Sequence, residues 1–314
     1  KMKPMTSRYV LMLGEDGMIK DDGIVSKINN QHFIATTTTG GAPKVLADME
    51  EYAQTEWPHL EVYMNSITEQ FSTFNISGPK SRAIMRKVFS NIDFSNEKFP
   101  FMTFNNFKYL DTEVRIMRAS FTGELGYEIY VSPKYALELW KKIFHSGKNL
   151  GLIPYGTETM HLLRAEKGYI VVGQDTDGTV TPIDLNLNWM IGKNKKDFIG
   201  KRSLSRSDTT REDRKQLVGI LPLDKSKNIL EGQHILESNT LPKKIVEPVA
   251  YLGHVTSSYH SPNLKHCVAM ALVKGGNKLM GKKVYVSDPG KFETIPVEIV
   301  NPVFLDPENK RLLS

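Results

Sequence analysis

The beginning of the chain alternates short apolar runs with turn residues and then changes to a helical period. Residues 8–39 contain three runs rich in β-branched and aromatic residues, and this pattern predicts strands. Four apolar residues at helical spacing follow: Val45, Leu46, Met49 and Tyr52. With Pro43 in the first turn, where a missing N–H costs nothing, they predict an amphipathic helix.

Residues 60–148 look like one unit in which both periods occur. In chain order, the pattern predicts strands over 59–67 and 69–78, a helix over 78–90, strands over 107–121 and 126–132, and a helix over 134–147. The order β-β-α-β-β-α is typical of a two-layer α+β domain.

The rest of the chain changes from helix to strand. Residues 154–168 predict a helix that ends at Gly168. Glu166 lies in its last turn, where the helix dipole disfavours an anion, so we expect it to pair with Arg164 or Lys167. A polar linker over 203–215 precedes short strands separated by turns, which predict a small all-β barrel.

Composition narrows the class of protein. The chain has 314 residues, 40% of them hydrophobic and 24% charged, so it is long enough for two or three globular domains. It has one cysteine, no secretory signal pattern and no apolar run long enough to span a membrane. We therefore expect a cytoplasmic protein without disulfides or a membrane partner.

Charge and motifs exclude several functions. The net charge of +6 suits an anionic small molecule, an acidic partner or nucleic acid, but the basic residues are interspersed with acids and favour a solvated face. We therefore expect no nucleic-acid partner. Neither phosphate-binding glycine motif is present. Asn186 replaces the glutamate of a calcium loop that would begin at Asp175, and the histidines around Cys267 lack zinc spacing.

Four acidic residues remain as candidates for chemistry. Asp21 and Asp22 are adjacent within an apolar stretch, and aspartate has a low strand propensity. They indicate either a turn at Lys20–Gly23 or a carboxylate held at the edge of a ligand pocket. In the stretch FTGELGYEIYV, Glu124 stands between two glycines and Glu128 lies in an apolar strand, where it either faces solvent or binds a ligand.

Together these stretches resemble the glycine cleavage T-protein superfamily of folate-dependent aminomethyltransferases. FTGELGYEIYV resembles its TGE–GYE strand, ISGPKSRAIMRKV its GP–A strand and helix, and LGHVTSS the first strand turn of its barrel. Within the superfamily, Pro154–Leu204 is very similar to the alpha subunits of heterotetrameric sarcosine oxidases. The resemblance covers essentially the whole chain.

The resemblance implies an α+β, aminomethyltransferase-like folate-binding fold. The expected divisions are a first α+β domain over 1–58 and 150–205, a ferredoxin-like α+β domain over 59–149 and a β-barrel domain over 215–314. The chain starts abruptly, so we expect the opening segment of the first domain to be missing. The alpha subunits also carry a dinucleotide-binding half before this region.

The resemblance also implies roles for individual residues. Asp22 matches the acid/base or electrostatic residue beside the reacting nitrogens N5 and N10, and Glu128 matches the carboxylate that binds the pterin ring. Asp21 is expected to cap the turn, and Glu124 is a further folate-binding candidate. Tyr9 and Tyr127 are expected either to stack on the pterin ring or to pack in the core. The family arginine before R-x-E-x-G is absent, and Glu158 or His161 are its possible substitutes.

The implied reaction transfers a one-carbon unit from a sarcosine-derived iminium to tetrahydrofolate, giving 5,10-methylenetetrahydrofolate and glycine. FAD, FMN and NAD are expected only in the missing half or in partner subunits, namely a flavin-bearing beta subunit and small subunits of a hetero-oligomer. The alternatives are a stand-alone T-protein-like aminomethyltransferase and a non-catalytic folate-binding or assembly module. No metal is expected.

Overall fold

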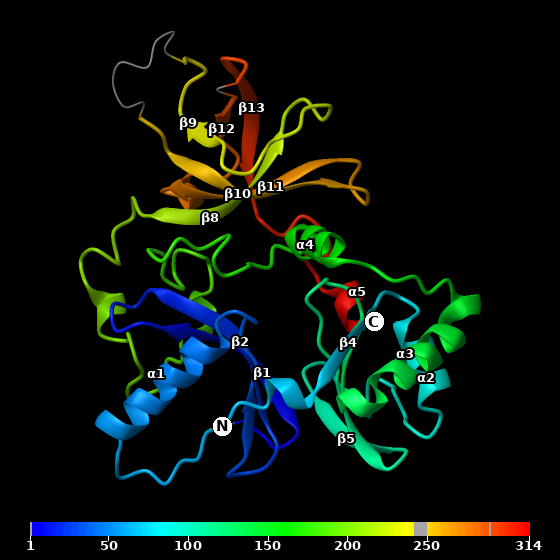
Figure 1. Cartoon of the computed structure of the whole chain (residues 1–314). Coiled ribbons are helices and arrows are strands. Elements are labelled where there is room, and N and C mark those ends of the chain that lie inside the picture. The colour runs from blue at the N-terminus through cyan, green and yellow to red at the C-terminus, as the bar shows by residue number, and fades with distance from the viewer. Residues whose placement is uncertain (1, 242–249, 289) are drawn as a thin grey trace. The chain divides into compact units, whose positions relative to one another are not determined.

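The structure, a computed structural model, describes residues 2–241, 250–288 and 290–314 (Figure 1). The chain divides into two compact units. The first contains Lys1–Val10, Asp21–Tyr155 and Asn309–Ser314, and the second contains Leu11–Lys20 and Gly156–Glu308. The boundaries of these two units differ from those of the three expected domains. The three-domain division stays a prediction.

A three-stranded sheet, in the order β1-β2-β3, opens the fold. Its strands are β1 (Thr6–Leu13), β2 (Ile19–Lys27) and β3 (Phe33–Ala35), and helix α1 (Ala42–Thr55) follows with a proline in its first turn, as predicted. The turn between β1 and β2 is closed by a hydrogen bond from Gly14 N to Met18 O of 2.9 Å. The predicted turn at Lys20–Gly23 is wrong, because Asp21 and Asp22 lie inside β2.

The α+β part of the first unit is a four-stranded antiparallel sheet with two helices. Its elements are β4 (Ser72–Ser77), α2 (Ser81–Val88), β5 (Phe104–Tyr109), β6 (Thr112–Met117), β7 (Gly126–Val131) and α3 (Pro133–Gly147), and the strand order is β4-β7-β6-β5. The buried inner side of α2, with Ile84, Val88 and Phe89, packs into the core of this sheet as predicted.

The order of these elements differs from the prediction at two places. Residues 59–67 form no strand, and Tyr63 is 93% exposed. A run of β-prone residues without a partner strand has nothing to hydrogen-bond to, so its local propensity is not enough to form a strand. The stretch 107–121 contains most of a hairpin rather than one strand, because the chain turns at Leu110, which has a positive φ of 54°.

The larger segment of the second unit, Gly156–Glu308, begins with helix α4 (Thr157–Glu166), which ends before Gly168, a residue with a φ of 74°. The expected partners of Glu166 are wrong. Its carboxylate accepts hydrogen bonds from Ser261 and Asn263, while Arg164 pairs with Asp175 and Lys167 with Asp306. The Glu166 carboxylate is therefore hydrogen-bonded by neutral side chains, while Arg164 and Lys167 each form an ion pair with an aspartate.

The predicted barrel is present and closed, in the order β10-β11-β8-β13-β12-β9. Its strands are β8 (Lys215–Pro222), β9 (His234–Leu236), β10 (Gly253–Ser261), β11 (His266–Lys274), β12 (Lys283–Asp288) and β13 (Glu293–Val300). Helix α5 (Lys310–Leu313) follows the barrel. Short 3-10 helices lie at Thr68–Gln70, Lys148–Leu150, Asn188–Met190, Ser203–Ser205 and Gly276–Leu279.

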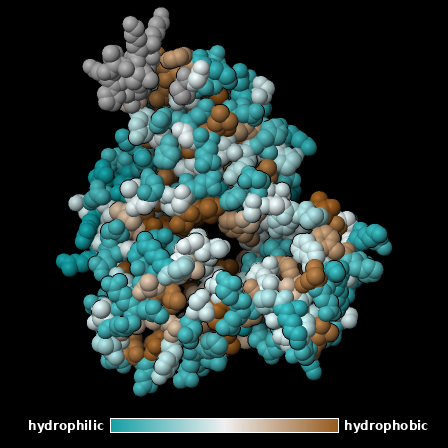
Figure 2. Space-filling model, in the orientation of Figure 1, coloured by the Kyte–Doolittle hydropathy of each residue, from teal (hydrophilic) through white to brown (hydrophobic). Residues whose placement is uncertain are grey.

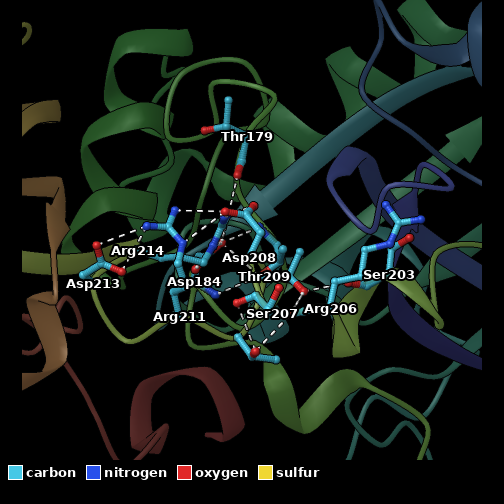
Figure 3. Close-up of polar contacts among 12 residues, drawn as sticks. Thr179, Asp184, Ser203, Arg206, Ser207, Asp208, Thr209, Arg211, Asp213 and Arg214 are labelled. Carbon is cyan, nitrogen blue, oxygen red and sulfur yellow. Dashed lines mark hydrogen bonds and ion pairs between the residues drawn. The ribbon is translucent and has the colours of Figure 1, made fainter.

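The predicted linker before β8 is polar but firmly held (Figure 3). Arg214 contacts Asp184 at 2.8 Å and Asp208 at 3.3 Å, and it also donates to Thr179 O. Arg211 pairs with Asp208 and Asp213. Because Arg214 is largely buried, this network fixes the chain just before β8.

Hydrophilic residues cover most of the visible face of the molecule, with hydrophobic residues scattered among them (Figure 2). None of the described helices combines the length and hydropathy that a membrane span requires.

Candidate functional site

The carboxylate of Asp22 is held by the side chain of Tyr9. These residues lie on the neighbouring strands β2 and β1, and Tyr9 Oη donates a hydrogen bond of 2.6 Å to Asp22 Oδ2. Burial raises the pKa of Asp22, the Tyr9 hydrogen bond opposes this rise, and the nearby charge of Asp21 adds to it. Asp22 therefore holds a proton more readily than an ordinary aspartate, which suits a group that exchanges protons with a ligand.

Asp21 has a different, structural environment. It is 3% exposed, and its carboxylate accepts hydrogen bonds from Asp22 N, Thr38 N and Thr38 Oγ1. A Cβ atom at Gly41, the residue before α1, would lie 1.8 Å from Asp21 Oδ2. The expectation that Asp21 caps its own turn is thus wrong: it fixes the loop that leads into α1.

Glu128 lies in the middle of β7 in a largely desolvated position. Its Oε2 accepts a hydrogen bond from Tyr130 Oη, while Oε1 has no hydrogen-bond partner among the residues that the structure describes. Burial raises the pKa of Glu128, and the Tyr130 hydrogen bond partly opposes the rise. Burial and the charge of Glu128 in turn raise the pKa of Tyr130, so the phenol stays protonated and remains a donor.

Two further polar groups surround Glu128. Asn75 on β4 is its cross-strand partner, and Asn75 Oδ1 accepts a hydrogen bond of 2.8 Å from Tyr155 Oη and another from Ser77. Burial raises the pKa of Tyr155, and the charge of Glu128 contributes to that rise. A carboxylate, an amide and two phenols thus share one part of the sheet surface.

Glu124 and Tyr127 have partners within the protein. Glu124 Oε1 forms an ion pair of 2.9 Å with Arg311 Nη1 of α5. Tyr127 is fully buried in the core, where its ring meets Phe94 and Phe99 edge-on. Of the two expectations for Tyr127, the structure supports core packing, because no face of the ring is exposed.

Two groups of polar residues therefore emerge within the first unit, each around one predicted site residue. One pairs Tyr9 with Asp22, and the other places Glu128 with Tyr130 and Tyr155. The period of two along a strand puts Tyr130 on the same face as Glu128, so the sequence contained a signal for it. Tyr155 had none, because it reaches Asn75 across 80 residues of chain.

The possible substitutes for the missing arginine lie on α4, in the second unit. Glu158 is exposed. The Nδ1 atom of His161 is buried and has no hydrogen-bond partner in the described part of the chain. Within residues 2–241, 250–288 and 290–314, no three or more His, Cys, Asp or Glu side chains lie together in a group that could hold a metal ion.

Comparison with known proteins matches both parts of the chain to family models. Residues 1–195 match the GCVT N-terminal domain, and residues 215–306 match the glycine cleavage T-protein C-terminal barrel domain. A solved structure of the glycine cleavage system aminomethyltransferase T from Bartonella henselae superposes with a TM-score of 0.79. It covers 97% of this chain and 77% of that one at 24% identity, a likeness of fold.

Curated relatives of two kinds are similar to the chain. The sarcosine oxidase subunit alpha of Corynebacterium sp. (strain U-96) is 44% identical over 99% of the chain and 32% of its own length. That of Rhizobium meliloti is 39% identical over 98% and 31%. The aminomethyltransferase of Thermoanaerobacter pseudethanolicus is 30% identical over 91% of the chain and 73% of its own length. The chain spans about a third of the length of the sarcosine oxidase relatives.

Proposed function

This chain belongs to the glycine cleavage T-protein family, and we propose that it binds tetrahydrofolate and assists the transfer of a one-carbon unit to it. The observation that carries the proposal is the half-buried Asp22 carboxylate, which Tyr9 orients and which has a raised pKa. A partly buried carboxylate that has a shifted pKa and is held by a specific partner is a candidate functional group.

The surroundings of Glu128 fit the pterin end of the ligand. A pterin presents an exocyclic amine and a ring N–H side by side, and one carboxylate can accept both hydrogen bonds. Tyr130 fixes the orientation of the carboxylate through Oε2, and Oε1 has no other partner in the described residues. Burial strengthens such a contact, because water competes less for the carboxylate.

Asp22 fits the reacting end. Bound tetrahydrofolate supplies the nitrogen atoms that accept the one-carbon unit, and positive charge develops beside them. A fixed aspartate at this position stabilises that charge when ionised. It also exchanges protons with the nitrogens, and its raised pKa brings the two protonation states closer in energy at neutral pH. Tyr9 keeps the carboxylate in one orientation.

For the donor of the one-carbon unit, we propose the iminium that forms when sarcosine is oxidised at a flavin outside these residues, with 5,10-methylenetetrahydrofolate and glycine as products. The 44% identity to a sarcosine oxidase subunit alpha supports this donor over that of a stand-alone aminomethyltransferase, to which the identity is 30%. The partners would be a flavin-bearing beta subunit and small subunits.

A titration with tetrahydrofolate tests the binding role of Glu128. Glu128→Gln removes a charged acceptor, and a hydrogen bond to a charged group contributes about 1.5–3 kcal/mol. Since about 1.4 kcal/mol corresponds to tenfold in affinity, we expect the Kd to rise by at least about tenfold. Glu138→Gln on the exposed face of α3 is the matched control and should leave the Kd unchanged. An unchanged Kd for Glu128→Gln would contradict the proposed contact.

The role of Asp22 is tested in the assembled oxidase. Asp22→Asn keeps the shape of the side chain but removes its charge, so binding should persist while transfer slows. Sarcosine oxidation should continue, and the product should shift from methylenetetrahydrofolate to free formaldehyde as the iminium hydrolyses. An unchanged ratio of these two products at saturating tetrahydrofolate would show that Asp22 has no part in the transfer.

A further inference from the structure

The last residues of the described chain return to the first compact unit after the barrel. We refer to Asn309–Ser314 as the strap. It belongs to the first unit, although the residues immediately before it belong to the second. It contains the single-turn helix α5 (Figure 1), and its Leu312 side chain is only 4% exposed.

Two arginines of the first unit hold the main chain of the strap. Arg118 is 2% exposed, and its Nη2 donates to Leu313 O at 3.2 Å and to Ser314 O at 3.1 Å. Its Nη1 donates to Phe99 O at 2.9 Å. Arg82 Nη2 donates to Ser314 O at 2.6 Å. The strap is thus bound by a buried guanidinium that Phe99 O also holds, on a residue that directly follows β6.

Burying the Arg118 guanidinium next to Arg82 is unfavourable unless both cations have hydrogen-bond acceptors. Burial lowers the pKa of Arg118, Tyr127 opposes this shift, and the positive charge of Arg82 adds to it. Two neighbouring cations repel each other, so they need acceptors in fixed positions. The carbonyl oxygens of the strap provide such acceptors, together with Asn96 Oδ1, which both arginines contact.

The strap also reaches the loop that leads into β7. Arg311 pairs with Glu124, four positions before Glu128. On its other side, this loop is held at Leu125 O by Gly78 N at 2.9 Å and by Ser81 Oγ at 3.1 Å. The loop is therefore fixed both by the start of α2 and by the strap.

We propose that the strap positions Glu128, with Arg118 anchoring the strap and the Arg311–Glu124 ion pair transmitting its position to the loop. This inference rests on the proposed function, because the strap would hold the proposed tetrahydrofolate-binding residue Glu128 in place from outside the sheet. Glu124 then acts through Arg311 and not by touching the ligand. Arg118, Arg311 and Glu124 are positioning residues.

A charge-swap experiment in the full chain tests the ion pair. Arg311→Met should weaken tetrahydrofolate binding by about twofold to fivefold, the loss that corresponds to the contribution of a partly exposed ion pair. Glu124→Arg should do the same, and Glu124→Arg combined with Arg311→Glu should restore the Kd to near its original value. Arg86→Met, on the exposed side of α2, is the control and should change nothing.

Amide hydrogen exchange of residues 122–128 provides a readout that needs no ligand. Arg311→Met should accelerate exchange there, and the swapped pair should slow it again. Arg118→Lys, a conservative change that keeps the charge but loses the forked contacts, should accelerate it too. If the unchanged chain binds no tetrahydrofolate, the proposed function fails, but accelerated exchange would still support the strap.

Two results would overturn the inference. One is unchanged exchange at 122–128 in both Arg311→Met and Arg118→Lys. The other is weaker binding in Arg311→Met with unchanged exchange and no rescue by the swapped pair, which would make Arg311 a direct ligand contact.

Discussion

At the scale of the single residue, Asp22 is subject to two opposing influences. Burial favours its neutral form, and the hydrogen bond from Tyr9 favours its anion. Since burial has the larger effect, the pKa of Asp22 lies above its ordinary value. The proposed electrostatic role needs the anion, so transfer should weaken on the acid side at a higher pH than a solvated aspartate would give.

Tyr9→Phe should shift the loss of transfer activity on the acid side, the acid limb of the pH profile, to still higher pH. The substitution removes the donor that lowers the pKa of Asp22, so a larger fraction of Asp22 is protonated at any given pH. The measurement is the pH profile of methylenetetrahydrofolate formation. Tyr285→Phe on β12 is a control with no contact to Asp22 and should leave the profile in place. A limb that stays in place in Tyr9→Phe would show that the Tyr9 hydrogen bond does not tune Asp22.

The sequence alone could predict part of this site. The resemblance pointed to Asp22 and Glu128, and the period of a strand places Tyr130 on the face of Glu128. That Tyr9 orients Asp22 is recognisable only once β1 and β2 are paired. Local propensity placed Asp21 and Asp22 in a turn, because aspartate is unfavourable in strands. Contacts with Tyr9 and Thr38 override that propensity, and neither contact can be predicted from the residues next to Asp21 and Asp22.

At the scale of the element, the start of α1 depends on a close approach between strand and loop. Gly41 precedes the helix, and its missing side chain leaves room for the carboxylate of Asp21. A Cβ there would lie 1.8 Å from Asp21 Oδ2 and 2.6 Å from Thr38 Oγ1. The backbone of Gly41 has an ordinary φ of −83°, so the restriction is one of space and not of conformation.

Gly41→Ala should therefore lower the free energy of unfolding by about 1–3 kcal/mol, the usual cost of overpacking. The neighbouring Gly40 is an ideal control, because a Cβ at Gly40 would meet nothing within 4 Å. Chemical denaturation of both variants is the measurement. Equal stabilities of Gly40→Ala and Gly41→Ala would contradict the close approach.

A buried ion pair ties α4 to the barrel strand β10. Arg164 and Asp175 have fully buried side chains, and Asp175 also accepts hydrogen bonds from Thr256 and Ser257 at the bulge of β10. Asp175→Asn would leave the Arg164 charge without its anion, so we expect a loss of about 3–5 kcal/mol in the free energy of unfolding.

The control for this pair is Glu212→Gln, which removes an exposed ion pair with Lys278. Water and salt screen such a pair, so its loss should not change the denaturation midpoint. A similarly small effect of Asp175→Asn would show that the buried pair is not needed for stability.

Helices and strands were predicted correctly where the hydrophobic pattern was long. The prediction was wrong where strand formation depends on a partner strand. The helices near 78–90 and 134–147 and the barrel strands other than the three-residue β9 follow directly from their periodicity, whereas β9 was not predicted. The run over 59–67 has strand-like composition but no partner, and the 107–121 stretch divides at Leu110. Strand pairing is a property of the folded chain, so composition could not decide either case.

At the scale of the whole molecule, the chain corresponds to about a third of the sarcosine oxidase relatives. If the proposed donor is right, sarcosine oxidation takes place outside these residues. The purified chain should then bind tetrahydrofolate but show no sarcosine-dependent oxygen consumption, which an oxygen electrode can measure. Oxygen consumption by the chain alone would contradict the proposed division of labour.

The closed barrel also determines where unwanted self-association can begin. A sheet with an open edge offers unpaired N–H and C=O groups to a second copy, and strand addition of this kind starts aggregates. The barrel strands close on one another in the described structure. Strands β1, β3, β4 and β5 are the outer strands of the other two sheets, and β1 is bridged at Thr6 to Thr103. Lys108 on β5 places a charge on one of these edges. Strand addition by a second copy is therefore expected at the outer strands of the two open sheets and not at the barrel.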